Sequence, residues 1–343
     1  MRALIDRLAE QRILTRDAFK LLLTCEDAYL QERAREARHQ VYGKQVFIRG
    51  LIEFTNYCKH DCYYCGLRCS NTTVPRYRLS LEQMLDCCRL GYDLGFRTFV
   101  LQGGEDAYYA DDDALIDILQ AIKERYPDCA ITLSVGERSY ESYQRLFEAG
   151  ADRYLLRHET ADAAHYSTLH PAQMTLESRK QCLQDLKQIG YQVGCGFMVG
   201  APGQTLDHLV DDLLFIKELD PAMVGIGPFI PHADTPFAGE KAGDLRLTLN
   251  ALSILRLMKP SLLLPATTAL GTIAPDGREL GILAGANVVM PNLSPMDTRK
   301  KYLLYNGKIS TDDDPRYCRD VIDRKLQAIG YEVVTARGDC IDL

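Results

Sequence analysis

Short apolar runs alternate with longer helical patterns eight times between residues 46 and 291. The runs are rich in aliphatic and β-branched residues and predict strands at 46–54, 98–102, 130–134, 153–157, 192–198, 223–229, 262–267 and 287–290. Gly95, Gly150 and Gly190 stand where the intervening helices would end. This alternation predicts an α/β fold, a (βα)8 TIM-type barrel over residues 46–291, and a doubly wound open sheet is the alternative.

The segments on either side of this repeat have other patterns. Residues 1–45 are helical in pattern and rich in charge, and are predicted to form an N-terminal helical cap. Residues 292–343 are predicted to form a C-terminal extension of loop and helix. Within the repeat, Ser80 and Gln83 predict a capping box, and Thr205 is predicted to begin another helix.

The composition limits the partners of the chain. Hydrophobic residues make up 46% and charged residues 25%, as in ordinary globular proteins. No apolar run approaches the roughly 18 residues that a membrane span needs, and the first residues do not resemble an export signal. We therefore expect a cytoplasmic protein that binds no membrane. The net charge of −7 argues against nucleic acid as a partner, because phosphate binding needs clustered Lys and Arg.

Three of the 12 cysteines, Cys58, Cys62 and Cys65 of CKHDCYYC, are set apart by their close spacing in a loop after the first predicted strand. Such loops form the catalytic face of a (βα)8 barrel. Thiolates favour zinc or an iron–sulfur cluster. A zinc site would need a fourth ligand, for which Cys69 or His60 could serve, but structural zinc sites favour widely separated cysteine pairs. A 4Fe–4S cluster held by three cysteines would instead leave one iron open to an external ligand.

The fourth predicted strand and the residues after it, ADRYLLRHET, carry several charges. Side chains alternate along a strand, so Arg153, Leu155, Arg157 and Glu159 would share one face. If this face points into the barrel, two arginines and a carboxylate line the lumen, where buried charges need partners. This pattern predicts an anion-binding cavity. The alternative is that the charged side chains face the surrounding helices and extend to solvent.

Two motifs resemble the radical S-adenosylmethionine superfamily. One is CxxxCxxC with Tyr64 before its last cysteine, and the other is the LQGGED turn after the second predicted strand. The resemblance implies that the three cysteines hold a 4Fe–4S cluster whose open iron binds S-adenosylmethionine. It also implies that Gly103 and Gly104 lie against the methionine amino group, where glycine lets the backbone approach closely.

Further segments are similar to the HydE family of FeFe-hydrogenase maturases, from about residue 40 to residue 310. These segments are RYLLRHET, GFMVGAPGQT, GIGPFIPHADTP, PATTALGT and GANVVMPNLSP. By this resemblance, the residues that contact S-adenosylmethionine are Tyr64, Gln102, Gly103, Gly104, Ser134, Glu159 and Arg179. The residues that it implies for the substrate are Thr132, Arg153, Arg157, Met223, Thr267, Thr268, Met290, Tyr302 and Tyr305.

The resemblance also implies a reaction and partners. A one-electron reductant would drive cleavage of S-adenosylmethionine to a 5′-deoxyadenosyl radical. The radical would act on a small anionic organometallic or amino-acid-like substrate, namely a cysteine-bound iron–carbonyl–cyanide precursor of the hydrogenase H-cluster. The maturases HydG and HydF would be the protein partners, and the chain would be a monomer. The C-terminal region holds only Cys318 and Cys340, so no second cluster is expected there.

Two other radical reactions stay open as alternatives. One is a mutase similar to methylornithine synthase, which would act on lysine. The other, less favoured, is sulfur insertion similar to that of biotin synthase. Two cavity arginines suit an anionic substrate better than lysine.

Overall fold

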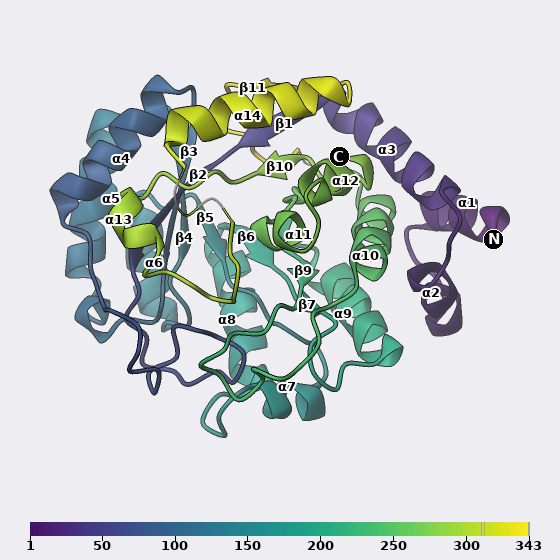
Figure 1. The fold of residues 1–343 in the computed structure, drawn as a ribbon, viewed down its shortest axis with the longest axis horizontal. Coiled ribbons are helices and arrows are strands. Elements are labelled where there is room, and N and C mark those ends of the chain that lie inside the picture. Colours follow the sequence, from purple (N-terminus) through teal and green to yellow (C-terminus); the bar gives the residue numbers. More distant parts are fainter. Residues whose placement is uncertain (310, 312, 342–343) are drawn as a thin grey trace.

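The predicted strand positions pair into a parallel ring around a central lumen (Figure 1). The computed structural model describes residues 1–309, 311 and 313–341. Six strands follow one another around the ring: β2 (Gly50–Thr55), β3 (Thr98–Gly103), β4 (Ala130–Ser134), β5 (Arg153–Leu155), β6 (Gln192–Cys195) and β8 (Met223–Val224).

A segment without a regular ladder closes the ring. Leu263 pairs with Met223, and Pro265 pairs with Val288 of β10 (Val288–Val289). β10 in turn pairs with β1 (Gln45–Ile48), which leads into β2. The predicted strand at 262–267 thus pairs only at isolated positions. Pro265 contributes to this, because proline has no N–H to donate to a ladder. The closed ring confirms the TIM-type barrel and excludes the open sheet.

Two predicted strands, 192–198 and 223–229, are each broken in two. Beyond the breaks, β7 (Met198–Val199) pairs with β9 (Gly227–Pro228). The breaks lie at Gly196 and Gly225, whose backbones touch: a Cβ on Gly196 would lie 2.0 Å from the Gly225 carbonyl oxygen. Only glycine allows this approach, and the sequence alone did not reveal it.

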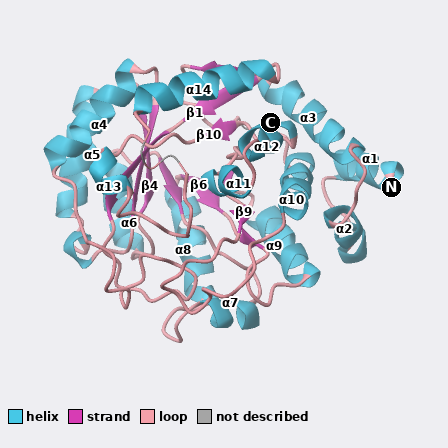
Figure 2. Cartoon of the chain, viewed as in Figure 1, coloured by secondary structure: helices cyan, strands magenta, loops and turns pink. Residues whose placement is uncertain are grey.

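Helices surround the ring, and one of them, α11 (Thr268–Ile273), lies over its mouth (Figure 2). They are α4 (Leu81–Asp93), α5 (Asp113–Arg125), α6 (Tyr140–Glu148), α7 (Ala163–Leu169), α8 (Leu176–Ile189), α9 (Leu206–Leu219), α10 (Leu245–Met258), α11, α12 (Gly277–Leu283) and α13 (Met296–Arg299), with a 3₁₀ turn at Ala107–Tyr109. Both predicted helix starts are confirmed as capping boxes, Ser80 with Gln83 and Thr205 with His208. None of the helices within the described residues has the length and apolar composition needed to cross a lipid bilayer.

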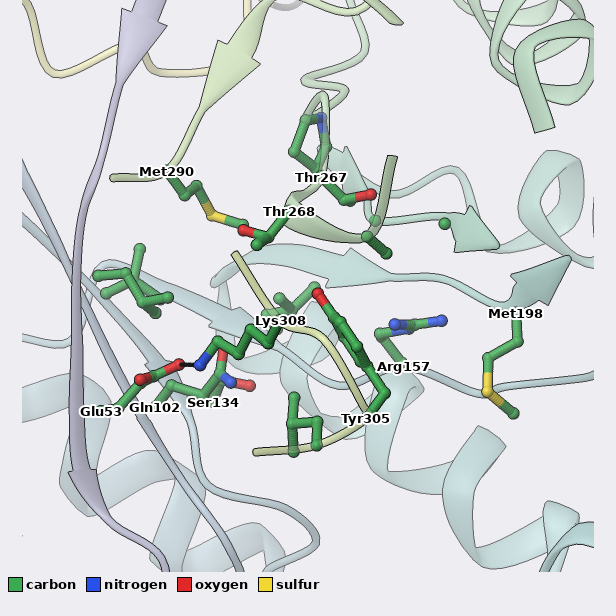
Figure 3. A pocket seen from close by; sticks show the side chains of 18 of the residues that line it. Glu53, Gln102, Ser134, Arg157, Met198, Thr267, Thr268, Met290, Tyr305 and Lys308 are labelled. Carbon is green, nitrogen blue, oxygen red and sulfur yellow. Dashed lines mark hydrogen bonds and ion pairs between the residues drawn. The ribbon is translucent and has the colours of Figure 1, made fainter. Parts of the chain in front are cut away.

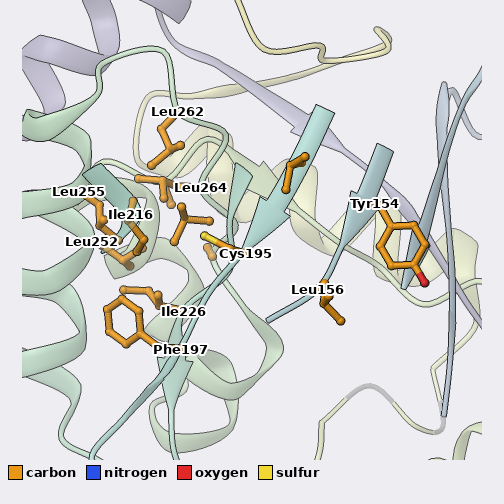
Figure 4. Packing of buried hydrophobic residues seen from close by; sticks show 14 of the residues in the cluster. Tyr154, Leu156, Cys195, Phe197, Ile216, Ile226, Leu252, Leu255, Leu262 and Leu264 are labelled. Atoms are coloured by element: carbon orange, nitrogen blue, oxygen red, sulfur yellow. The ribbon is translucent and has the colours of Figure 1, made fainter. Parts of the chain in front are cut away.

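The main core lies between the ring and its helices. Figure 4 shows Ile216 of α9 and Leu252 and Leu255 of α10 packed toward Cys195 of β6 and Leu264. All five side chains are buried, Ile216 at 4% exposure and the others at 0%. Cys195 therefore contributes to the core as a small hydrophobic residue.

The N-terminal segment forms three helices, α1 (Arg2–Gln11), α2 (Arg16–Leu23) and α3 (Tyr29–Tyr42). α3 and α2 pack against α10, on the right in Figure 1. Phe19, Leu22 and Leu30 are fully buried there. The cap thus extends the apolar layer of the barrel.

The C-terminal extension returns to the N-terminal ends of the strands. It contains α14 (Pro315–Ala328) and a strand that the sequence did not predict, β11 (Glu332–Val334), which pairs with β1. Beyond β11, Asp339 accepts a hydrogen bond of 2.6 Å from the Arg153 guanidinium, whose side chain is 0% exposed. The Arg337 carbonyl oxygen accepts a second one of 2.9 Å. The tail thus forms the floor of the barrel and supplies the counter-charge for Arg153.

This floor predicts an effect of Asp339→Asn on stability. Burial opposes ionisation of Asp339, but hydrogen bonds from Arg337 and Arg153 and the charge of Arg153 outweigh it and lower its pKa. The pair should therefore stabilise the fold above the unfolded-state pKa, and this stability should be lost as pH falls through the folded-state pKa. We expect the substitution to lower the free energy of unfolding by about 2 kcal/mol near pH 7, with a smaller difference in acid, as measured by urea denaturation.

Asp220→Asn is the matched control. Asp220 forms a surface ion pair with Lys259 at 2.7 Å, and its side chain is 61% exposed. Its loss should change the unfolding free energy by less than about 0.5 kcal/mol. Equal effects of the two substitutions would contradict the role of Asp339 in the floor.

Candidate active site

The loop between β2 and α4 carries the three predicted cluster cysteines at the mouth of the barrel. Its backbone is held from several sides: the Lys59 N–H donates to the Glu105 carbonyl oxygen at 2.9 Å, and the Tyr63 N–H donates to the Leu169 carbonyl oxygen at 3.0 Å. Arg68 and Asp61 form an ion pair within the loop. These bonds hold the loop in place without help from the thiols, which leaves the thiols available as ligands.

Burial raises the pKa of all three thiols, that of Cys65 to about 12. The charges of Cys65 and Cys58 raise the pKa of Cys62 further, and the charge of Cys58 raises that of Cys65. Cys69, in contrast, is exposed. Across the described residues, no three His, Cys, Asp or Glu side chains come together closely enough to hold a single metal ion. The exposed position of Cys69 disfavours the closed zinc site that it would complete.

The GGE turn packs directly on this loop. A Cβ on Gly104 would lie 2.2 Å from the Tyr57 carbonyl oxygen and 2.7 Å from the Cys58 Cβ. Glu105 joins the same contact, because its carboxylate bonds His60 Nε2 at 2.8 Å. The turn and the loop thus form one unit, and Gly104 has no space for a side chain.

A cavity of about 350 Å³ opens from Tyr64 and Cys65 into the lumen (Figure 3). Its wall contains these predicted residues: Tyr64, Gln102, Gly103, Thr132, Ser134, Arg157, Glu159, Met223, Thr267, Thr268, Met290, Tyr302 and Tyr305. Others lie just behind the wall: Gly104 against Cys58, and Arg179, which donates to the Arg157 carbonyl oxygen at 2.6 Å. Cys62 approaches the Met174 sulfur at 3.8 Å.

The cavity wall contains polar atoms without a hydrogen-bond partner. They are Thr132 Oγ1, Thr267 Oγ1, Arg49 Nε and Arg157 Nε. Arg157 Nη2 and Glu159 Oε2 lie 3.0 Å apart as an ion pair, but without hydrogen-bond geometry. Buried polar atoms are normally paired, because an unpaired one costs free energy. Such atoms around one cavity are typical of a site that a polar ligand completes.

Glu159 is held in a strained position at the wall. Its φ of 64° lies in the left-handed region, which residues other than glycine rarely adopt. Its carboxylate lies 3.0 Å from Arg157 Nη2. Burial raises the pKa of Glu159 despite the charges of Arg157 and Arg179. Strain of this kind clusters at functional sites, which supports the predicted role of Glu159 in ligand binding.

The cations of the cavity differ from the predicted pair. Arg157 lines it, but Arg153 does not, because its side chain points to the floor and bonds Asp339. Arg49, between β1 and β2, takes its place: it is 5% exposed, lines the cavity and donates to the Met223 sulfur at 2.8 Å. The alternation of side chains correctly placed Arg153 and Arg157 on the lumen face. Their different positions along the barrel axis put Arg153 at the floor and Arg157 in the cavity.

Glu53 and Lys308 also line the cavity and were not predicted from the sequence. Glu53 lies within the apolar run VFIRGLIEF that predicted the first strand, and Arg49 lies in the same run. Charges inside such a run were a usable signal for lumen-facing residues. Lys308 lies beyond the predicted barrel, and no local pattern marked it.

The residues present fit a 4Fe–4S cluster and S-adenosylmethionine. Three partly buried thiols on one loop suit a cluster with one open iron. The cavity begins at Cys65, so a ligand of that iron would enter it. Thr132 Oγ1 and Arg157 Nε, which have no hydrogen-bond partner, would then face a polar ligand.

Several known proteins are similar to this chain in sequence, and one solved structure is similar to it in fold. The radical SAM superfamily matches residues 52–216. The [FeFe] hydrogenase maturase subunit HydE of Thermotoga maritima is 46% identical, over 96% of this chain and 94% of that protein. The 3-methylornithine synthase of Methanosarcina barkeri is 31% identical, over 95% and 92%. The crystal structure of methylornithine synthase (PylB) superposes with a TM-score of 0.85 and 29% identity, covering 96% of this chain and 97% of that one.

The contact between turn and loop predicts the effect of Gly104→Ala. The added methyl group would collide with the backbone of the cysteine loop and displace Cys58. We expect iron bound after anaerobic reconstitution to fall at least about twofold, since overpacking shifts the neighbouring backbone. Iron content and the visible absorption spectrum measure this, and circular dichroism checks the fold.

Cys69→Ala is the control on the same loop. Its thiol is exposed and stands outside the three-cysteine set, so bound iron should not change. If Cys69→Ala lost its iron while Gly104→Ala kept it, the assignment of the ligands would be wrong.

Proposed function

Since the chain belongs to the HydE family of the radical SAM superfamily, we propose that it is a radical S-adenosylmethionine enzyme of FeFe-hydrogenase maturation. Its reaction would process a cysteine-bound iron–carbonyl–cyanide precursor of the H-cluster. The observation that carries this proposal is the 46% identity to a HydE over nearly the whole length of both chains. The cavity that opens from Cys65, with Arg49, Arg157 and Glu159 in its wall, supports it independently.

Cys58, Cys62 and Cys65 would hold the 4Fe–4S cluster. When bound and reduced by a one-electron donor, the cluster and S-adenosylmethionine together supply a 5′-deoxyadenosyl radical. The cofactor's contacts would come from Tyr64, Gln102, Gly103, Gly104, Ser134, Glu159 and Arg179, which lie in or directly behind the cavity wall.

The chain's own residues would orient the reactants and exclude water. The wall encloses the cavity with apolar as well as polar side chains, among them Met223 and Met290. A radical reaction needs this shielding, because it prevents side reactions. Thr132, Thr267, Thr268, Tyr302 and Tyr305 would provide hydrogen bonds that fix the substrate.

The charges of the wall favour an anionic substrate. Among the described residues, no carboxylate lies within ion-pair distance of Arg49. Arg157 Nε has no hydrogen-bond partner, whereas Arg157 Nη2 pairs with Glu159. Arg49 and Arg157 would thus bind a carboxylate or another anionic group. HydG would provide the substrate, HydF would receive the product, and the reaction would take place in the cytoplasm with the enzyme as a monomer.

A mutase acting on lysine is the second candidate. The likeness to methylornithine synthase in sequence and structure favours it. A lysine substrate would bring an ammonium group, which needs a free carboxylate. Both carboxylates of the wall are already occupied, Glu159 by Arg157 and Glu53 by Lys308. We therefore rank this candidate second.

An anaerobic maturation assay that lacks HydE tests the proposal. Adding this protein after reconstitution should restore hydrogenase activity, and Cys62→Ala should abolish the restoration. Release of 5′-deoxyadenosine, measured in parallel, reports the radical chemistry separately. If deoxyadenosine forms but hydrogenase activity does not return, the maturase role is wrong; conversion of lysine would then support the mutase.

A further inference from the structure

A strap of chain beyond the barrel, residues 300–308, spans the mouth of the cavity. On one side the Gly66 N–H of the cysteine loop donates to the Leu304 carbonyl oxygen at 3.0 Å. On the other, the Asn306 N–H donates to the Pro231 carbonyl oxygen at 3.0 Å. Tyr302, Leu304 and Tyr305 of the strap line the cavity. The strap therefore connects the cysteine loop to the loop after β9 and forms part of the cavity wall.

The strap ends in a buried ion pair. Lys308 reaches into the lumen and bonds the carboxylate of Glu53 on β2 (Figure 3). The two side chains are 7% and 1% exposed. The Lys308 ammonium also donates to the Tyr302 carbonyl oxygen at 2.9 Å. Asn292 Nδ2 donates to the second Glu53 oxygen at 2.7 Å.

This pair differs from the ligand-seeking groups of the cavity. Both Glu53 carboxylate oxygens and the Lys308 ammonium have hydrogen-bond partners within the chain, whereas Arg49 Nε, Arg157 Nε and Thr132 Oγ1 have none. A satisfied pair has little to offer a ligand. The role of the pair therefore lies in the segments that it holds together.

The pair holds Tyr302, which in turn holds Gln102. Lys308 bonds the Tyr302 carbonyl oxygen, and the Tyr302 side chain is buried at 1% exposure. The Tyr302 hydroxyl accepts a hydrogen bond from Gln102 Nε2 at 3.2 Å. Gln102 lies at the end of β3, directly before the Gly103–Gly104 turn. A chain of contacts thus runs from the strap to the predicted S-adenosylmethionine site.

We propose that Glu53 and Lys308 are positioning residues: their ion pair fixes the strap over the cavity and thereby orients Tyr302 and Gln102 for S-adenosylmethionine. This inference deepens the proposed function and rests on it. Breaking a buried pair by removing one partner leaves an unpaired charge in the lumen, which is strongly unfavourable. Opening the strap would let water hydrate this unpaired charge. Loss of either partner should therefore open the strap, and loss of both should open it less.

Limited trypsin digestion of the reconstituted holoenzyme tests this inference. Lys300 and Lys301 provide cleavage sites within the strap, and mass spectrometry identifies the fragments. We expect Glu53→Gln and Lys308→Met each to raise the cleavage rate there at least about tenfold. The double variant should recover part of the protection, and Lys308→Arg, which keeps the cation, should recover most of it.

S-adenosylmethionine affinity provides the second readout. Equilibrium dialysis should show a several-fold weaker Kd for the single variants and partial recovery in the double variant. Glu26→Gln is the matched control, because Glu26 pairs with Arg246 on the surface with its side chain 80% exposed. Neither its strap cleavage nor its Kd should change.

Three outcomes would overturn the inference. The strap could be cleaved at the wild-type rate in both single variants, or the Kd for S-adenosylmethionine could stay unchanged although the strap is open. The cleavage rate could also rise equally throughout the chain. The last would mean that the pair only stabilises the fold. None of these measurements uses the hydrogenase pathway. A protein that fails in maturation, but whose variants open the strap and lose S-adenosylmethionine affinity, would refute the maturase role and retain the positioning role.

Discussion

The need to compensate charge inside the barrel is the constraint on which the rest of this structure depends. Three ion pairs lie along the lumen: Arg153 with Asp339 at the floor, Arg157 with Glu159 in the cavity, and Lys308 with Glu53 under the strap. An ion taken out of water without a partner costs several kcal/mol, roughly the whole stability margin of a domain. Each charge that serves the cavity therefore requires a counter-charge placed by the fold.

Chain beyond the barrel supplies two of these counter-charges. Asp339 comes from the C-terminal tail and Lys308 from the strap, whereas Glu159 follows directly after β5. The C-terminal extension is thus part of the site, since it closes the lumen at both ends. Arg49 is the exception: within the described chain its guanidinium meets a sulfur and a carbonyl oxygen instead of a carboxylate. Arg49, with no carboxylate at ion-pair distance among the described residues, lines the cavity in which an anionic ligand would bind.

Local patterns predicted what local physics determines. The period of two along strands, the capping boxes at Ser80 and Thr205, and the spacing of the three cysteines all involve residues close in sequence, and the structure has the barrel and both caps where they were expected. The partners across the lumen could not be predicted in this way. Asp339 is 186 residues from Arg153, and Lys308 is 255 residues from Glu53. No periodicity within one element encodes which distant segment reaches a buried charge, so Arg153 was assigned to the cavity and Lys308 was missed.

The cysteine loop and the cavity are mechanically linked by the strap. Gly66, one residue after Cys65, touches the strap so closely that a Cβ there would lie 2.2 Å from the Leu303 carbonyl oxygen and 2.5 Å from the His232 ring. Close-packed contacts transmit displacement instead of absorbing it. The Gly66 N–H also donates to the Leu304 carbonyl oxygen, so the contact is directional as well as steric. A change in the conformation of the cysteine loop must therefore move the strap, and with it Tyr302 and the Lys308–Glu53 pair. Cluster site and substrate cavity are in this sense two ends of one packed unit.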